Sequence, residues 1–215
     1  MLSKFTNKTY GIVSYATYED RYSDFEKTLN NSFELVVAPK QKYFSIDDVE
    51  FNKGAKSLIS ANESIFLKEK LIKNETFMIV EDDILLVDNY ENLLESLFNE
   101  IPTDWDILSI GYHVNTPLNI IKLENSNLPY YKLIPYEEIV GTHALIYKKS
   151  VVDFILNEVE SINEPWDWFL FKRVYPKFNT YISTQKIVYQ QSYREIEIDK
   201  NAYYKKFKSK IKYDS

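Results

Sequence analysis

A short apolar segment that runs directly into three carboxylates is the feature that most constrains this chain. Residues Thr76-Phe-Met-Ile-Val80 form a continuous apolar run, which is typical of a strand covered on both faces. Glu81-Asp82-Asp83 follows it without a break. Open α/β sheets bind ligands at the carboxyl ends of their strands. The pattern therefore predicts a ligand site where a buried central strand ends.

Strand-like and helix-like segments alternate along the rest of the chain. This alternation predicts a single-domain α/β architecture with a mostly parallel sheet flanked by helices. Apolar runs and period-2 alternation predict strands at 10–15, 33–37, 76–80, 106–110, 142–147, 181–183 and 187–189. Three-four spacing predicts helices at 19–30, 52–73, 90–101, 152–159 and 165–173. Gly111 is expected to end its strand, and residues 112–139 to form either a hairpin between 120–123 and 130–133 or a loop.

The composition excludes several kinds of chemistry. The chain has 215 residues, no Cys and two His, His113 and His143. Disulfides, thiolate zinc sites, cysteine nucleophiles and a three-His metal centre within one chain are therefore excluded. Hydrophobic residues make up 45% and aromatic residues 16% of the chain, which is too much buriable surface for a mainly disordered protein.

The charge is divided unevenly between a domain at 1–199 and a C-terminal tail at 200–215. The tail carries six Lys and one Asp, a charge of +5. Because the whole chain has a net charge of −6, the domain carries −11. The acidic domain argues against general binding of nucleic acid. For the tail, attachment to an anionic membrane surface, contact with nucleic acid and a solvated helix end all remain open.

The expected location is cytoplasmic, with peripheral membrane contact through the tail as an addition. No apolar run approaches the roughly 20 residues that cross a bilayer, and the first residues lack the apolar segment of a secretory signal.

The three carboxylates at the strand end indicate a cation or substrate site. Adjacent like charges destabilise one another unless a cation or hydrogen-bond donors offset them. Carboxylate oxygens suit Mg²⁺ or Mn²⁺. Alternation along an extended backbone would put Glu81 and Asp83 on one side and Asp82 on the other. The alternative is a solvated turn with an Asp at a helix N-cap.

The segment Phe77-Met-Ile-Val-Glu-Asp-Asp-Ile-Leu-Leu86 resembles the acidic motif of family 25 glycosyltransferases, which include lipopolysaccharide and collagen galactosyltransferases. Further segments resemble other motifs of that family in the same order, over roughly residues 8–192: Tyr18-Glu-Asp-Arg21, 54–66, 104–111, 141–149, Pro165-Trp-Asp167 and 188–191. The chain departs from the family at Ser60-Ala61, where the family has Ser-His.

The resemblance implies a GT-A type, Rossmann-like fold that binds a nucleotide sugar, expected to be a UDP-hexose. It implies inverting transfer of the hexose to a glycan, a glycolipid or another hydroxyl acceptor, as in lipopolysaccharide biosynthesis. Mn²⁺ or Mg²⁺ would bridge the acidic triplet and the diphosphate. Asp83 would be the direct metal ligand, Glu81 would contact the metal or the ribose, and Asp82 would contact the ribose or support the site from behind.

Asp167 is the expected general base, because inverting transfer needs a carboxylate that takes the proton of the acceptor hydroxyl. It lies between Trp166 and Trp168, whose rings could raise its pKa or stack on a sugar. The alternative is an exposed Asp in a first helical turn, flanked by two core tryptophans.

Further contacts to the donor are expected from the first strand and its turn. These candidates are Ser14, Tyr15 and Arg21. His143 could donate to the diphosphate or complete the metal site, and His113 is a further candidate.

Three other functions remain open on the sequence: a glycosyltransferase that modifies DNA bases, a sugar nucleotidyltransferase, and a non-catalytic carbohydrate-binding module on the same fold. A nucleotidyltransferase usually carries a glycine-rich phosphate loop near its N-terminus, whereas this chain has one Gly between residues 1 and 53.

Overall fold

The computed structural model of the chain describes residues 5–14, 18–29, 32–39, 53–114, 126–134 and 139–190. Tyr15, residues 120–123 and the basic tail at 200–215 lie outside these residues, as do the side chains of Ser14 and Arg21. None of the helices within the described ranges is both long and apolar enough to cross a membrane.

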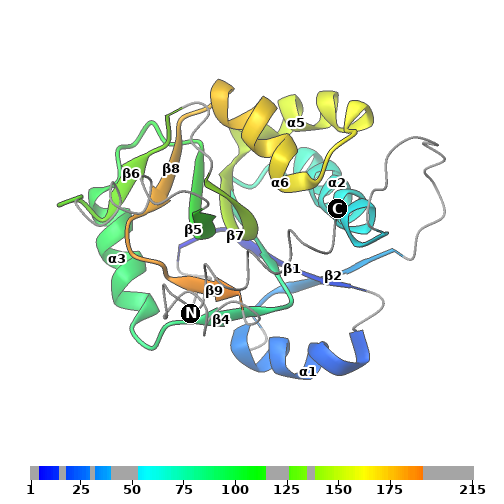
Figure 1. Cartoon of the computed structure of the whole chain (residues 1–215), viewed down its shortest axis with the longest axis horizontal. Helices are drawn as coiled ribbons and strands as arrows, with labels where there is room; N and C mark the ends of the chain where they lie inside the picture. The colour runs from blue at the N-terminus through cyan, green and yellow to red at the C-terminus, as the bar shows by residue number, and fades with distance from the viewer. Residues whose placement is uncertain are drawn as a thin grey trace, which may run out of the picture.

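A seven-stranded sheet in the order β2-β1-β3-β7-β5-β8-β6 forms the centre of the fold (Figure 1). Its strands are β1 (Lys8–Ser14), β2 (Glu34–Ala38), β3 (Thr76–Glu81), β5 (Ile107–Val114), β6 (Tyr130–Lys132), β7 (Ile139–Lys148) and β8 (Thr180–Ser183). β1 pairs in parallel with β2 and β3, β5 pairs in parallel with β8, and β7 runs antiparallel to both β3 and β5. Because β6 also runs antiparallel to β8, only β6 and β7 oppose the common strand direction.

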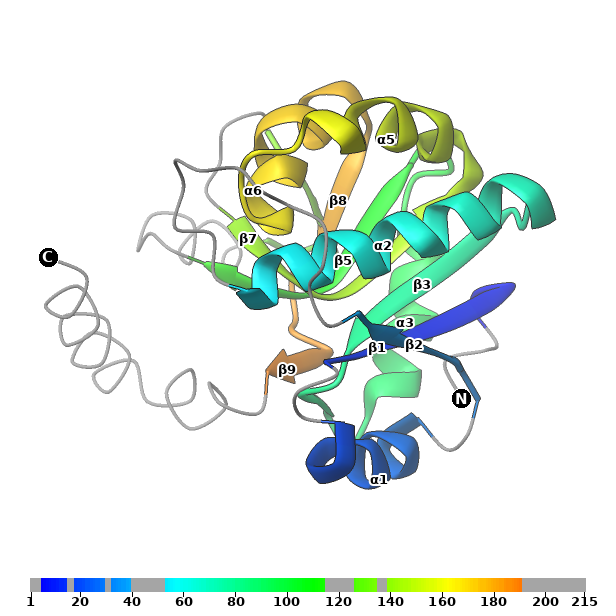
Figure 2. The same cartoon turned by 90° about the vertical axis from the view of Figure 1, so that its right-hand side faces the viewer.

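Helices cover both faces of this sheet. They are α1 (Tyr18–Leu29), α2 (Lys53–Ile72), α3 (Tyr90–Glu100), α5 (Val152–Glu158) and α6 (Trp166–Phe169). Figure 2 shows α2, α5 and α6 on one side of the strands and α1 on the other. The predicted α/β class, with a mostly parallel sheet flanked by helices, is confirmed, and the layout is consistent with the Rossmann-like GT-A type.

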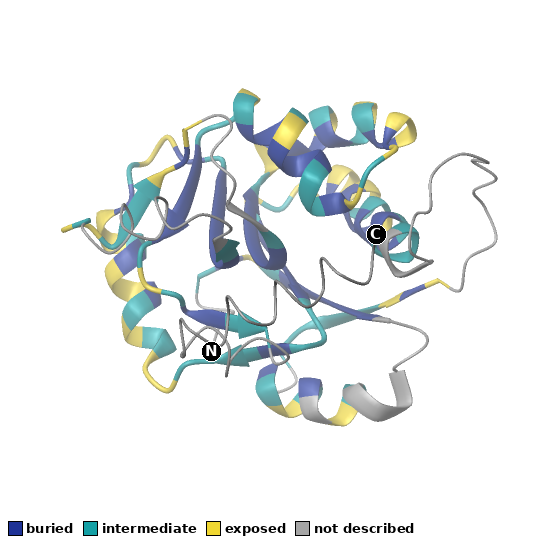
Figure 3. Cartoon of the chain, viewed as in Figure 1, coloured by how far each residue is buried: buried dark blue, intermediate teal, exposed yellow. Residues whose placement is uncertain are grey.

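β3 is covered on both of its faces, as its apolar run predicts. Figure 3 shows that the strands in the middle of the sheet are largely buried. Phe77 and Ile79 belong to the core that includes residues of α2, α5 and α6, whereas Met78 and Val80 belong to the core under α1 and α3. All four side chains are at most 3% exposed. Each buried side chain of this size contributes about 1.5–3 kcal/mol, so β3 is firmly fixed in the sheet.

A second, small sheet lies at the end of β3. β4 (Ile84–Leu86) follows directly after the two-residue turn Asp82–Asp83 and pairs antiparallel with β9 (Val188–Gln190). Ile84, Ile187 and Val188 are almost fully buried. This antiparallel pair therefore brings residues near position 190 next to the acidic turn.

Two predicted elements differ from the structure. Gly111 does not end its strand: β5 continues to Val114, and its pairing with β7 shifts register on both sides of Gly111. A glycine within a strand often marks such a bulge, where another group approaches the backbone closely. The helix expected at 165–173 is α6 followed by a π-helical turn, Leu170–Val174, and then a 3₁₀ turn, Tyr175–Lys177.

The segment at 130–132 forms strand β6, whose partner is β8. The pairing with residues 120–123 that the sequence suggested falls outside the described residues.

Candidate functional site

Polar side chains from four strands and one helix meet at the carboxyl edge of β3. β3 and β5 end at this edge, and β7 begins there because it runs antiparallel to both. The residues that gather there are Glu81 of β3, His113 of β5, Thr142 and His143 of β7, Gln190 of β9, Asp167 of α6 and the acidic turn Asp82–Asp83.

Glu81 is held by its neighbouring strand. Oγ1 of Thr142 donates a hydrogen bond of 2.5 Å to Oε1 of Glu81. Burial raises the pKa of the Glu81 carboxyl to about 7, and the negative charges of Asp83, Asp167 and Asp82 act in the same direction. The hydrogen bond from Thr142 opposes this rise. A positive charge near Glu81 would offset the electrostatic repulsion among these four carboxylates.

The acidic turn departs from the alternation expected of an extended chain. The backbone leaves the strand after Glu81, and Asp82 and Asp83 form the turn that leads into β4. Nε2 of Gln190 donates a hydrogen bond of 2.7 Å to Oδ2 of Asp83. Glu81 and Asp83 are therefore fixed by hydrogen bonds from two different strands.

The two histidines of the chain lie against each other. Their ring centroids are 4.8 Å apart and the rings are tilted by 51°. Nε2 of His113 lies 2.9 Å from Oε1 of Gln190. The rings fit because two glycines leave room: a Cβ on Gly111 would lie 2.6 Å from Cδ2 of His143, and one on Gly141 would lie 3.0 Å from Cδ2 of His113.

His143 is held in a neutral state. Burial lowers the pKa of its imidazole well below the usual value, and the positive charges of His113 and Lys186 lower it further. A neutral ring donates one hydrogen bond and accepts one, but it brings no positive charge to a diphosphate. Of the two roles predicted for His143, the first can therefore act only through a neutral hydrogen bond.

Asp167 lies in the first turn of α6, close enough to Glu81 for the two charges to interact. Its charge raises the pKa of Glu81, and the charge of His113 in turn lowers the pKa of Asp167. Burial has the larger effect and raises the pKa of Asp167 above its ordinary value, although the amide of Trp168 donates a 2.9 Å hydrogen bond to its Oδ1. A carboxylate in such surroundings is more basic than an exposed one.

The two neighbouring tryptophans differ. Trp166 is 1% exposed and packs on Phe66 and Phe169, at centroid distances of 6.0 and 5.2 Å. Trp166 is therefore a core residue and not a platform for a sugar. Trp168 is partly exposed and retains that candidate role.

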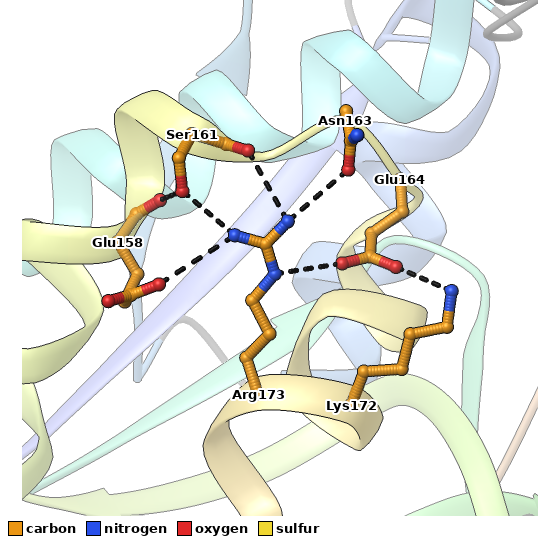
Figure 4. Close-up of polar contacts among 6 residues, drawn as sticks. All are labelled: Glu158, Ser161, Asn163, Glu164, Lys172 and Arg173. Carbon is orange, nitrogen blue, oxygen red and sulfur yellow. Dashed lines mark hydrogen bonds and ion pairs between the residues drawn. The ribbon is translucent and has the colours of Figure 1, made fainter.

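A network around Arg173 fixes the loop that leads to Asp167 (Figure 4). The guanidinium donates to Oε1 of Glu164 at 3.1 Å, to Oγ of Ser161 at 2.8 Å and to Oδ1 of Asn163 at 3.3 Å. Lys172 binds the second oxygen of Glu164. Because Arg173 lies in the π-helical turn after α6, these contacts tie the loop before Asp167 to the turn after it.

The donor set fits a divalent cation that a substrate would complete. Among the described residues, no three His, Cys, Asp or Glu side chains are placed to hold a metal together. Mg²⁺ is usually held by only one or two carboxylates and takes its other ligands from phosphates and water. Glu81 and Asp83 supply two such carboxylates at the strand end.

Of the predicted site residues, Glu81, Asp82, Asp83, His143 and Asp167 come together as described. Ser14 ends β1 at the same edge, two residues beyond the pairing of Ile12 with Glu81, and its side chain is not described. Neither Tyr15 nor the side chain of Arg21 is described.

Sequence reasoning missed the roles of Thr142, Gln190 and Lys186. Nζ of Lys186 lies 5.4 Å from the ring of Tyr112 and 5.7 Å from that of Tyr189, beside the histidines. Thr142 and Gln190 lie in segments that resemble family motifs, but only their pairing across the sheet assigns them to the carboxylates.

Comparison with known proteins gives weak likenesses only. No protein-family model and no curated protein matches the chain. A glycosyltransferase involved in glycosylation of the major capsid of PBCV-1 is similar with a TM-score of 0.45 and 10% identity, over 85% of this chain and 92% of that one.

Two further solved structures resemble the chain at the same level. The A197 protein from STIV has a TM-score of 0.41 and 14% identity, over 84% of this chain and 83% of that one. The inositol-1-phosphate CTP transferase from T. maritima has a TM-score of 0.40 and 19% identity, over 83% and 67% of the two chains. These likenesses are too weak to carry a function.

Proposed function

We propose that this chain is a glycosyltransferase that uses a nucleotide sugar and binds its donor at Glu81, Asp82 and Asp83. One observation carries the proposal: three carboxylates end the central strand β3, Thr142 and Gln190 orient two of them, and a fourth carboxylate, Asp167 of α6, is close enough to interact with Glu81. When such a group of carboxylates is ionised, the like charges destabilise one another, and a bound cation would offset this repulsion.

Mn²⁺ or Mg²⁺ bound there would offset the negative charge that develops on a leaving nucleoside diphosphate. Asp83 and Glu81 would hold the ion, and Asp82 would contact the ribose or support the turn. The edge of the sheet also includes the end of β1, where Ser14, Tyr15 and Arg21 would contact the nucleotide. The donor that we propose is a UDP-hexose.

Asp167 would act on the acceptor. Its carboxylate would take the proton of the acceptor hydroxyl as that oxygen bonds to the anomeric carbon. The bond from that carbon to the diphosphate would break, and the diphosphate would leave with the electron pair. This single displacement inverts the anomeric centre. The raised pKa of Asp167 suits a group that must accept a proton near neutral pH.

The acceptor class that we propose is a glycan, a glycolipid or another hydroxyl compound, as in lipopolysaccharide assembly in the cytoplasm. Peripheral membrane contact through residues 200–215, and the alternative of a DNA-base acceptor, rest on the sequence of that tail alone.

The sugar nucleotidyltransferase is less well supported. A glycine-rich phosphate loop near the N-terminus would need glycines before residue 54. The sequence has one there, Gly11, and it lies within β1. A Cβ there would lie 2.5 Å from the ring of Phe25, so this glycine serves packing. A non-catalytic module with the same fold would bind a carbohydrate without turnover.

A screen of UDP-, GDP- and CMP-sugars tests the proposal. We expect at least one UDP-hexose to release its nucleoside diphosphate slowly, through transfer to water, when Mn²⁺ is present and not when EDTA is present. Binding of the donor without any turnover would favour the non-catalytic module. No binding and no turnover with any nucleotide sugar would overturn the proposal.

A further inference from the structure

We propose that Gln190 is a positioning residue. Its side-chain amide fixes the carboxylate of Asp83 on one side and holds the ring of His113 with a hydrogen on Nε2 on the other. The part that concerns Asp83 rests on the proposed function, because it concerns the affinity for a metal-bound nucleotide. The part that concerns His113 is a property of the free protein.

Chemistry decides which way the amide of Gln190 faces. An ionised carboxylate only accepts hydrogen bonds, so the side of the amide next to Asp83 must be its NH₂ group, at 2.7 Å from Oδ2. The amide oxygen then faces Nε2 of His113 at 2.9 Å. Because an amide oxygen only accepts, that nitrogen must carry a hydrogen.

The backbone on both sides of this link is rigid. Gln190 pairs with Ile84, the residue after Asp83, in the β4–β9 ladder. The amide of Ile187, three residues earlier, donates a 3.2 Å hydrogen bond to the carbonyl of Ile110 in β5. β9 is therefore attached to the strand that carries His113 and to the strand that follows the acidic turn. A side chain that starts from this strand can hold both groups in fixed positions.

The surroundings of the ring leave His113 little freedom. His143 packs on one side at a centroid distance of 4.8 Å and is 2% exposed. Gly141, with φ of 97°, has its backbone so close to His113 that a Cβ would lie 3.0 Å from Cδ2 of the ring. A ring packed this closely changes its hydrogen-bond partner only if the partner itself is removed.

Without Gln190, Asp83 would lose the donor that orients its Oδ2. Removal of a group that hydrogen-bonds to a metal ligand typically lowers the affinity for the metal by about 10–100-fold. We therefore expect the Mn²⁺-dependent affinity for UDP to depend on Gln190 by the same factor. The affinity for UDP without metal should stay unchanged.

The first test uses ¹⁵N NMR of the free protein, in which bare and hydrogen-bearing ring nitrogens have well-separated shifts. The chain has two histidines, and the variant His113→Gln assigns them. We expect Nε2 of His113 to carry a hydrogen at every pH at which the protein is folded. A bare Nε2 in the neutral ring would overturn the inference whatever the protein catalyses.

Two variants sharpen this test. Gln190→Met removes both hydrogen bonds at nearly constant length, so the share of the neutral His113 ring with its hydrogen on Nε2 should fall. Gln190→Glu keeps an acceptor toward His113, so the hydrogen should stay on Nε2. Identical tautomers in wild type and Gln190→Met would show that Gln190 does not hold the ring.

The second test measures UDP affinity with and without Mn²⁺ by titration calorimetry. Gln190→Met should lose about 10–100-fold in affinity only when Mn²⁺ is present. The control Gln185→Met changes an exposed glutamine of the preceding loop and should bind as the wild type does. Equal Mn²⁺-dependent affinity of wild type and Gln190→Met would overturn the inference. Absence of any Mn²⁺ effect in the wild type would instead contradict the proposed function.

Discussion

Thr142 donates a 2.5 Å hydrogen bond from β7 to the carboxylate of Glu81 on the neighbouring strand β3. The bond joins two antiparallel strands where the acidic turn begins. It stabilises the ionised form of a carboxyl whose pKa burial and three nearby carboxylates raise to about 7. The charge of this group therefore changes near neutral pH, in the middle of the candidate site.

The metal-free protein should lose stability as this group ionises. A carboxyl with a folded pKa of about 7 and an ordinary value of 4.5 stabilises the fold fully below pH 4.5, and this contribution is lost as the pH rises through 7. We expect the free energy of unfolding to fall by about 1–3 kcal/mol over this range through Glu81. Urea unfolding of wild type and Glu81→Gln at several pH values measures the difference.

The control is Thr142→Val. It removes the hydrogen bond that lowers the pKa of Glu81, so the fall in stability should move to higher pH. If the unfolding free energies of wild type and Glu81→Gln run parallel from pH 4 to 8, Glu81 has no raised pKa.

Asp167→Asn should lower turnover by about 10²–10⁴, the usual contribution of a positioned proton acceptor. The affinity for UDP with Mn²⁺ should barely change, because the proposed role of Asp167 is to take the proton of the acceptor. Steady-state kinetics and calorimetry on the same preparation separate the two effects. Asp153→Asn is the matched control, since the Asp153 side chain is 75% exposed and forms an ion pair with Lys70. Near-normal turnover in Asp167→Asn would move the base to another carboxylate.

Arg173→Met should destabilise the protein by about 1–3 kcal/mol. It leaves the carboxylate of Glu164, whose side chain is only 11% exposed, with Lys172, and it removes the guanidinium that donates hydrogen bonds to Ser161 and Asn163. The loop before Asp167 should also loosen, so turnover should fall while UDP affinity is kept. Arg173→Lys keeps the charge and loses the planar fork, and an intermediate effect is expected. Unfolding curves and turnover that match the wild type would show that the loop is held by other contacts.

Gly111→Ala should destabilise the protein by about 1–3 kcal/mol through overpacking. The new methyl group would lie 2.6 Å from Cδ2 of His143 and 3.0 Å from Cβ of Val188. The double variant with His143→Ala removes the clashing ring and should recover part of the loss. Additive losses in the double variant would show that the ring of His143 is not what the methyl group meets.

The sequence predicts those parts of the fold that depend on local patterns. Four adjacent apolar residues predict β3, and the 3-1-3 spacing of the apolar residues in α3 predicts that helix with its bounds within one residue. The carboxylates are likewise visible as a run. Their position at the carboxyl edge follows from the general rule for α/β sheets.

Contacts between distant segments are not visible in the same way. The hydrogen bond between Gln190 and Asp83 joins residues 107 positions apart, and no spacing rule predicts it. Gly111 was expected to end a strand because glycine is a local breaker, whereas its role is to make room for a ring from β7. The turn at Asp82 and Asp83 also defeats the alternation rule, which holds only while the chain is extended.

The most direct test of the donor site is the affinity for UDP with and without Mn²⁺, measured by calorimetry on the wild type and on Asp83→Asn. Asparagine keeps the acceptor for Gln190 and removes the charge, so the variant should fold normally. We expect Mn²⁺ to strengthen UDP binding to the wild type. With Mn²⁺ present, UDP at a hundredfold excess over its Kd should also stabilise the folded protein against unfolding by about 2.7 kcal/mol. Asp83→Asn should bind UDP equally with and without the ion. Equal UDP affinity of the wild type with and without Mn²⁺ would contradict the account.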